Sequence, residues 1–315
     1  MNKVNPGERL ESGSSIYKAL FLTIIPVILS QTIYQIGYTI DDLMFGKLMA
    51  LHKYEIDVVT SLQGVYNTQY NQLVNLPVAI ATAMAASTLP SIGLSRMQND
   101  MKAVNQKITQ VIKVNMVIAF PSAVGLSVLA EPIMKMMFPR LVTYQQQAIM
   151  LLTVGSSAVI FYALSTLTTS ILQGHNYMRL PVIHSAVSLG VHVILLGILL
   201  VLTDLNVYAL VICNVLFPLI VSILNCIAIT RKVGYQWELV NTFLKPLLAS
   251  VAMGMVAYVM YHVFFDAFKN VYIVSCLAIG AAIIVYAVLI LQLRCFDEDE
   301  LRSIPGGRVL VRLMR

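Results

Sequence analysis

The chain has 315 residues, of which 58% are hydrophobic and only 11% are charged. A soluble domain would carry charge on roughly a quarter of its residues, because water must solvate its surface. The composition therefore excludes an ordinary soluble protein and predicts a helix bundle in lipid. The net charge of +6 does not indicate nucleic-acid binding, since the basic residues lie between apolar runs and form no concentrated stripe.

Eight apolar runs without charge are candidates for membrane-spanning helices. A span needs about 20 residues, because a helix rises about 1.5 Å per residue and the hydrocarbon layer is roughly 30 Å thick. The third run is short, and we expect Val111, Ile112 and a snorkelling Lys113 to extend it. The predicted fold class is an all-α polytopic membrane helix bundle with about eight transmembrane helices. The predicted spans are 19–40, 67–94, 114–130, 145–172, 180–203, 205–230, 246–265 and 271–293.

These spans divide the chain into four parts. Residues 1–15 are polar and predict a cytoplasmic N-terminal segment, since the apolar core of a signal peptide does not follow the first charges. Residues 16–232 predict a six-helix transmembrane bundle, and 233–294 predict two additional helices. Residues 295–315 predict a basic cytoplasmic tail, which either lies on the membrane surface or is a frayed end.

The cationic residues are distributed unevenly between the two sides that eight spans define. Of the 21 lysines and arginines, 16 fall in the termini and the even-numbered connections. The opposite side holds only Lys47, Lys53, Lys135, Arg140 and Lys269. Positive residues favour the cytoplasmic side, so we predict a multi-pass protein of the cytoplasmic (plasma) membrane with both termini cytoplasmic. The longest outside connection, 47–66, is predicted to form a short interfacial helix.

The first span carries polar residues on one helical face. Positions 34, 35, 38 and 42 follow position 31 by three, four, seven and eleven residues. Such a face points either into a hydrated cavity or toward hydrogen bonds with neighbouring helices. We interpret it as a substrate-binding face, formed by Gln31, Tyr34, Gln35 and Tyr38. Asp41 and Asp42, near its outer end, either bind a cation or a proton, which makes them candidates for ion coupling, or cap the helix at the interface.

The second span begins with neutral polar and aromatic residues. This mixture suits a sugar, which needs several hydrogen bonds and a stacking surface, and it equally suits a helix that starts at the membrane interface. We name Asn71, Gln72 and Asn75 as candidate substrate contacts.

The remaining polar residues within spans favour structural roles. His184 and His192 are predicted to be hydrogen-bonded core residues, because no further metal ligands are evident near them. Asn214 and Asn225 are more typical of interhelical hydrogen bonds than of ligands. We expect no metal, no cofactor and no enzymatic activity, since nucleotide-binding and catalytic motifs are missing from the sequence.

Four segments resemble a known family when their order and spacing are taken together. They are LPVAIATAMAASTLPSIGLSRMQND (76–100), KITQVIKVNMVIAFPSAVGLSVLAEPIMKMMFP (107–139), ILQGHNYMRLPVIHSAVSLGVHVIL (171–195) and the tail DEDELRSIPGGRVLVRLMR (297–315). The chain resembles polysaccharide-type flippases of the MATE-like superfamily, a group with stage V sporulation protein B-like and lipid II flippase members. The resemblance covers the chain from about residue 16.

The resemblance implies a function and a missing part. These flippases have about fourteen helices, as two six-helix lobes and a terminal pair, and move lipid-linked glycans by alternating access. This chain would supply the second lobe and the terminal pair, so it looks truncated and would need a first-lobe chain or a homodimer as partner. Lipid II flippases hold the pyrophosphate with cavity arginines, but span 67–94 contains no Arg or Lys. A lipid-linked glycan in general is therefore the expected substrate.

Two other functions are compatible with the sequence. An ion-coupled multidrug exporter of the same superfamily would be favoured by a buried acid midway along a span, whereas the acids here lie near span ends. A non-transporting membrane scaffold is the other alternative, since the chain resembles only half of a transporter. Drug efflux would identify the exporter, and rescue of transport by a first-lobe chain would argue against the scaffold.

Overall fold

The computed structural model describes residues 13–97, 101–296 and 300, and every regular element in them is a helix. This confirms the predicted all-α polytopic bundle. The segments 1–15 and 295–315 lie mostly outside the described residues. The elements are α1 (Gly13–Leu51), α2 (Ile56–Gly64), the π-helical turn η1 (Val65–Tyr70), α3 (Asn71–Met97), α4 (Met101–Val128), α5 (Ala130–Met137), α6 (Gln145–Gly155), α7 (Ala158–Gly174), α8 (Arg179–Leu202), α9 (Val207–Val233), the π-helical turn η2 (Val240–Leu244), α10 (Lys245–Phe268) and α11 (Val271–Gln292).

Each predicted span coincides with a helix or with consecutive helices. Within the described residues, six helices are long and apolar enough to cross a membrane, or seven if the bent α6–α7 pair is one span. The first predicted span lies in α1, which has 39 residues but is not among these seven. The number of eight spans therefore stays a prediction.

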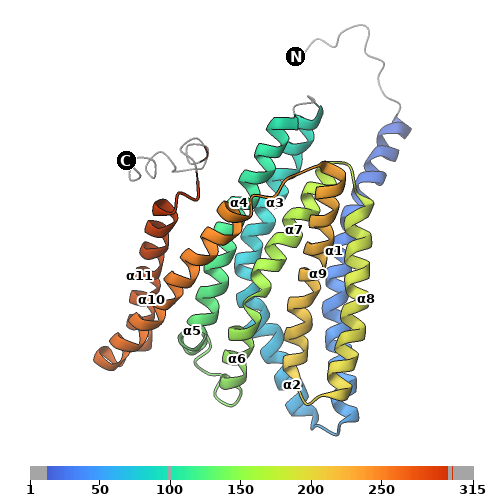
Figure 1. The fold of residues 1–315 in the computed structure, drawn as a ribbon. Helices are drawn as coiled ribbons and strands as arrows, with labels where there is room; N and C mark the ends of the chain where they lie inside the picture. Colours follow the sequence, from blue (N-terminus) through green and yellow to red (C-terminus); the bar gives the residue numbers. More distant parts are fainter. Residues whose placement is uncertain (1–12, 98–100, 297–299, 301–315) are drawn as a thin grey trace.

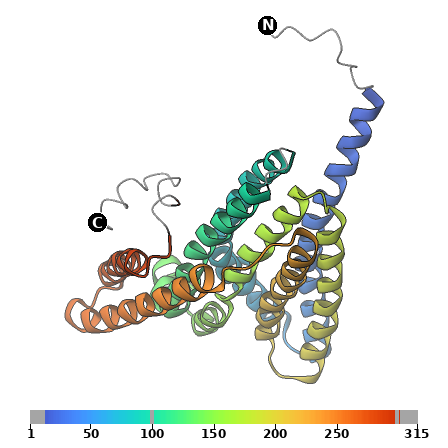
Figure 2. The same ribbon diagram turned by 45° about the horizontal axis from the view of Figure 1, so that its top comes forward.

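The helices form a main bundle with a separate pair at one side. α1 packs on α8, α8 on α9, and α9 on α7, which also contacts α3 and α4. α10 packs on α4 and α11, and Figures 1 and 2 show the α10–α11 pair leaning away from the other helices. In the described part of the chain, α1 packs closely on neither α3 nor α7. It is held mainly from the α8 side.

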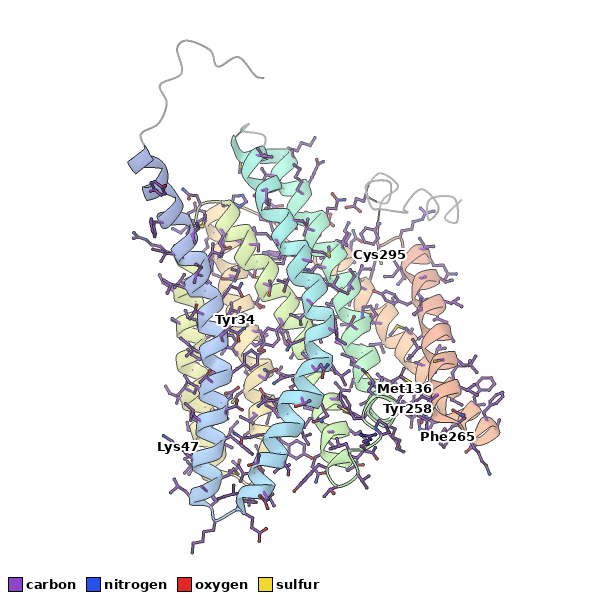
Figure 3. All side chains as sticks on the ribbon, turned by 180° about the vertical axis from the view of Figure 1, so that it is seen from behind. Tyr34, Lys47, Met136, Tyr258, Phe265 and Cys295 are labelled. Carbon is purple, nitrogen blue, oxygen red and sulfur yellow. The ribbon has the colours of Figure 1, made fainter. Side chains whose placement is uncertain are left out.

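The beginning of α1 and the end of α11 lie toward the same end of the bundle (Figure 1). Figure 3 places Cys295 toward this end, and Lys47, Met136 and Phe265 toward the other. This arrangement agrees with the even number of crossings that the sequence predicts.

The structure corrects the predicted connection 47–66. α1 continues to Leu51, and α2 begins at Ile56 and runs through η1 into α3 without a break. The expected interfacial helix is therefore the first part of a much longer helix. The polar residues of this segment are typical of a loop, which is why the sequence predicted a connection here. In the structure they form hydrogen bonds with α1: Gln63 Nε2 donates to the Asp42 carbonyl oxygen at 2.8 Å.

The prediction that Lys113 snorkels toward water is wrong. α4 begins at Met101, well before the predicted span, and the Lys113 side chain is only 3% exposed. Its Nζ lies 2.8 Å from Glu300 Oε1 and 3.5 Å from Glu238 Oε2. Acids from distant parts of the chain compensate the buried charge, so the lysine stays inside the protein.

The predicted fourth span is broken at a point where glycine is required. α6 and α7 meet at a bend of 46°. The Tyr70 side chain lies against Gly155, the last residue of α6, and a β-carbon there would overlap the ring and its hydroxyl. The absence of a side chain thus lets Tyr70 enter the bundle beside the bend.

Replacing Gly155 with alanine should destabilise the protein by about 1–3 kcal/mol, because the added methyl group overpacks against Tyr70. Gly190→Ala in α8 is the matched control, since a β-carbon there would meet nothing within 4 Å. Thermal unfolding in detergent should give a lower midpoint for the Gly155 variant than for the control. Equal midpoints would contradict the packing described.

Candidate substrate pocket

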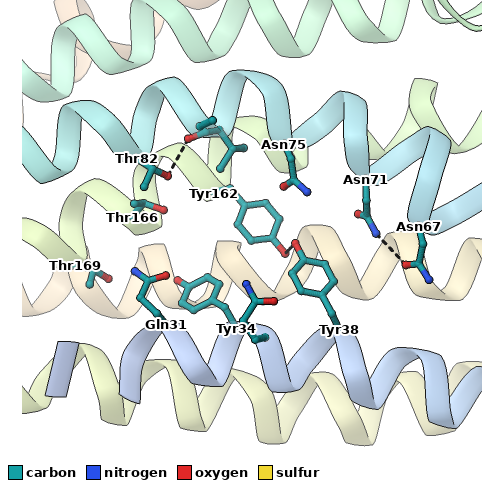
Figure 4. A pocket seen from close by; sticks show the side chains of 13 residues that line it. Gln31, Tyr34, Tyr38, Asn67, Asn71, Asn75, Thr82, Tyr162, Thr166 and Thr169 are labelled. Atoms are coloured by element: carbon teal, nitrogen blue, oxygen red, sulfur yellow. Dashed lines mark hydrogen bonds between the residues drawn. The ribbon is translucent and has the colours of Figure 1, made fainter. Parts of the chain in front are cut away.

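A pocket of about 600 Å³ opens between α1, α3 and α7. Figure 4 shows side chains from these helices converging on it. Its lining consists of amides, tyrosines, threonines and two small apolar residues. The described lining therefore offers hydrogen-bond donors, acceptors and ring faces and includes no charged side chain.

α1 contributes the face that the sequence predicts. Gln31, Tyr34, Gln35 and Tyr38 all line the pocket. Their spacing keeps them on one side of the helix, while α8 packs against another. Asp42, the last member of the predicted face, lies outside the lining, and its Oδ1 accepts a hydrogen bond from Asn67 Nδ2 at 2.8 Å.

η1 and α3 form the second wall. Asn67, Asn71 and Asn75 recur about one turn apart and line the pocket with Val78, Ala79 and Thr82. Asn71 Nδ2 donates to Asn67 Oδ1 at 3.4 Å, so Asp42 orients Asn71 through Asn67. The predicted contacts Asn71 and Asn75 lie in the pocket. The predicted contact Gln72 is exposed and lies outside it.

α7 forms a third wall, which was not predicted from the sequence. Tyr162, Thr166 and Thr169 line the pocket and are separated by four and three residues. The spacing rule that identified the face of the first span applies here as well. Threonine and tyrosine are common at contacts between membrane helices, however, so the signal was weaker than the glutamines of α1.

Hydrogen bonds behind the pocket connect its tyrosines to α9. Tyr38 Oη donates to Tyr162 Oη at 3.4 Å, and Asn214 Nδ2 donates to the same Tyr162 oxygen at 3.2 Å. Tyr70 Oη donates to Asn214 Oδ1 at 3.0 Å. These bonds confirm the predicted interhelical role of Asn214, and they fix the tyrosine rings at the back of the pocket.

A second network joins α8 and α9 to α7. His184 Nδ1 lies 2.7 Å from Asn225 Oδ1, and Asn225 Nδ2 donates to Thr168 Oγ1 and Thr169 Oγ1 at 3.2 and 3.0 Å. Asn225 is thus the buried, interhelical hydrogen-bonding residue that the sequence predicts, whereas His184 is hydrogen-bonded but only half-buried. Because Thr169 also lines the pocket, this network supports the α7 wall.

The adjacent acids Asp41 and Asp42 face different surroundings and do not share a site. Asp41 is buried, with its Oδ1 2.6 Å from His192 Nε2, whereas Asp42 is exposed. His192 is a hydrogen-bonded core residue, as predicted, but the sequence did not indicate its acidic partner. The described residues contain no group of three or more His, Cys, Asp or Glu that could hold a metal ion.

An apolar groove of about 760 Å³ lies on the other side of α3. Leu76 and Ile80 of α3 line it with Pro121 of α4 and with Ile279 and Ile283 of α11. α3 thus separates a polar pocket from an apolar groove. An amphiphile with a polar headgroup and a long hydrocarbon chain would match these two surfaces.

Comparisons with known proteins identify a family and several relatives. A family model described as lipid II flippase MurJ matches residues 4–282. Three proteins of Bacillus subtilis (strain 168) are similar: the uncharacterized membrane protein YabM (28% identity over 280 residues), the lipid II flippase MurJ (25% over 224) and stage V sporulation protein B (19% over 306). The alignments cover 81%, 68% and 97% of this chain, but 47%, 41% and 58% of those proteins. The chain therefore spans about half the length of these relatives. No solved structure matches it at a significant level.

Cysteine labelling tests whether the pocket is hydrated. In a chain without its four native cysteines, Gln35→Cys and Asn75→Cys should react with a charged maleimide, because both side chains are exposed in the pocket. Ile194→Cys in α8 is the control, since its 66% exposed apolar side chain should face lipid and react slowly. Equal labelling rates for all three variants in proteoliposomes would contradict a hydrated pocket.

Proposed function

The chain belongs to the lipid II flippase MurJ family, and we propose that it moves a lipid-linked oligosaccharide or cell-wall precursor across the cytoplasmic membrane by alternating access. The observation that carries the proposal is the uncharged polar pocket of about 600 Å³ inside a bundle of apolar helices. Polar side chains in a membrane are costly unless they serve a cavity or one another. A transporter of a polar headgroup needs such a cavity.

We assign the sugar part of the substrate to the pocket and its hydrocarbon chain to the apolar groove. The amides of α1 and α3 supply donors and acceptors for hydroxyl groups, and Tyr34, Tyr38 and Tyr162 supply ring faces. No lysine or arginine belongs to the described lining, although a diphosphate would need cationic partners. The cations would then come from outside this pocket.

A first lobe would supply the rest of the passage. Alternating access rocks two halves against each other around a shared site. This chain spans about half the length of its curated relatives. We infer that the opposite wall comes from a first-lobe chain or from a second copy of this chain.

The proposed orientation has both ends of the chain in the cytoplasm. Lys102, Lys107, Arg179, Lys245 and Arg294 lie near the helix ends on the side where α1 begins. The opposite helix ends carry fewer cations, and lysines and arginines favour the cytoplasmic side.

An ion-coupled multidrug exporter is the second candidate, because one observation favours it. Asp41 lies near the end of the apolar run in the sequence, but α1 continues beyond it, and its carboxylate is buried in the bundle. A buried acid within a membrane helix is the feature such an exporter needs. Drug efflux from vesicles, without movement of lipid II, would support the exporter.

Asn71→Ala should slow lipid II movement about fivefold, because one hydrogen bond to the sugar contributes about 1 kcal/mol. The neighbouring Gln72→Ala is the control, since Gln72 is exposed outside the pocket and should leave the rate unchanged. The assay is translocation of fluorescent lipid II in proteoliposomes that contain the chain, alone and co-expressed with a first lobe. Equal rates for the two variants would remove the assignment of the pocket.

A further inference from the structure

A buried acid–imidazole contact joins α1 to α8 and α9. His192 Nε2 lies 2.6 Å from Asp41 Oδ1, and the two side chains are 4% and 3% exposed. The other ring nitrogen, His192 Nδ1, lies 3.2 Å from the carbonyl oxygen of Cys213. Each nitrogen of the ring therefore faces an oxygen that accepts hydrogen bonds.

The geometry of this contact indicates how many protons the His192 ring and the Asp41 carboxyl group hold together. The carbonyl oxygen of Cys213 has no proton to give, so His192 Nδ1 must carry one and donate it. A neutral ring then has a bare lone pair on Nε2, and an ionised Asp41 has only acceptors. Two such atoms would repel at 2.6 Å, so one additional proton lies between them.

His184 provides an internal comparison on the same helix. Its Nδ1 faces Asn225 Oδ1 at 2.7 Å, and a neutral imidazole satisfies this contact by donating its own proton. The amide of Asn225 carries no charge. An extra proton is therefore required at His192 but not at His184.

Several titratable and charged side chains face Asp41 in the described structure, and His192 is the only basic one among them. Tyr38 and Asp42 belong to α1 itself, while Tyr66 comes from η1, Tyr162 from α7 and Cys213 from α9. Tyr66 Oη donates to Asp41 Oδ2 at 3.5 Å. The charge of Asp41 is thus compensated by the proton it shares with His192.

The pair lies directly behind the substrate pocket. A cavity of about 10 Å³, roughly the space of one water molecule, is bounded by Asp41, His192 and the rings of Tyr34, Tyr38 and Tyr162. The three tyrosines also line the large pocket. One layer of hydroxyl-bearing rings therefore separates the pair from water in the pocket.

We propose that Asp41 and His192 form a proton-binding site that couples lipid-linked substrate movement to a proton gradient. The pair holds one proton while α1 packs on α8 and α9. When the proton leaves, its bond to Nε2 or to Oδ1 breaks, a water molecule in the tyrosine layer takes the proton, and an uncompensated carboxylate remains beside a neutral ring. Burying that charge is costly, so α1 separates from α8 until water or a new proton reaches Asp41. The coupling rests on the proposed function, whereas the proton site does not.

Nitrogen NMR of ¹⁵N-histidine in the full chain, in lipid nanodiscs at neutral pH, tests the proton site directly. His192→Gln identifies the His192 signals, and together with the side-chain carbon of Asp41 they should show one proton more than a neutral ring and an ionised carboxylate hold. Asp41→Asn should convert them to neutral imidazole signals, because an amide can donate to Nε2 without an extra proton. His184 should be neutral in both proteins. A neutral His192 beside an ionised Asp41 carboxylate, read from the side-chain carbon signal of Asp41 in the same samples, or an imidazolium that persists in Asp41→Asn, would overturn the proposal.

Translocation of fluorescent lipid II under an imposed pH gradient tests the coupling. The unmodified chain and His184→Gln should be accelerated by the gradient to the same extent, whereas Asp41→Asn and His192→Gln should lose the response. Loss in all three variants, or in none, would refute the coupling, as would a response to sodium in place of protons. If the NMR result is as expected but lipid II does not move, the proposed function fails and the proton site remains.

Discussion

The buried contact between Asp41 and His192 is the physical constraint on α1 from which this account of the bundle starts. Ionisable side chains are rarely stable inside a membrane protein unless each meets a partner, and these two meet across α1 and α8 at 2.6 Å. The contact draws α1 toward α8 and α9. In the described structure α1 packs on α8 and packs closely on neither α3 nor α7. The space that remains between α1, α3 and α7 is the pocket.

The pocket and the buried pair are linked through tyrosines. Tyr38 and Tyr162 line the pocket on one side and bound the small cavity beside Asp41 and His192 on the other. Asn214 holds Tyr162 in place and accepts a hydrogen bond from Tyr70, whose ring reaches it because Gly155 has no side chain. A change in α1 would therefore alter the pocket wall and the environment of Asp41 and His192 together.

The sequence predicted features that local patterns encode. Hydropathy located the helices, and the spacing of Gln31, Tyr34, Gln35 and Tyr38 gave one pocket wall, because both depend on residues close in the chain. Contacts between distant residues were not predictable from such patterns. The position of His192 within an apolar run predicted its role in the core. Its acidic partner was not predictable, because Asp41 is 151 residues away in the chain. Likewise, hydropathy alone predicts that Lys113 reaches the surface. It is buried because Glu238 and Glu300, from distant parts of the chain, compensate its charge.

Pulsed electron paramagnetic resonance distances across the pocket test most directly whether this contact positions α1. Spin labels at Gln31 of α1 and Ala79 of α3 would report the opening in nanodiscs, and labels at Ile194 and Ile223 would report the α8–α9 packing as a control. The account predicts that Asp41→Leu, which leaves His192 Nε2 without a partner, broadens the first distribution and not the second, while Asp41→Asn preserves both. An unchanged α1–α3 distribution in Asp41→Leu would contradict it.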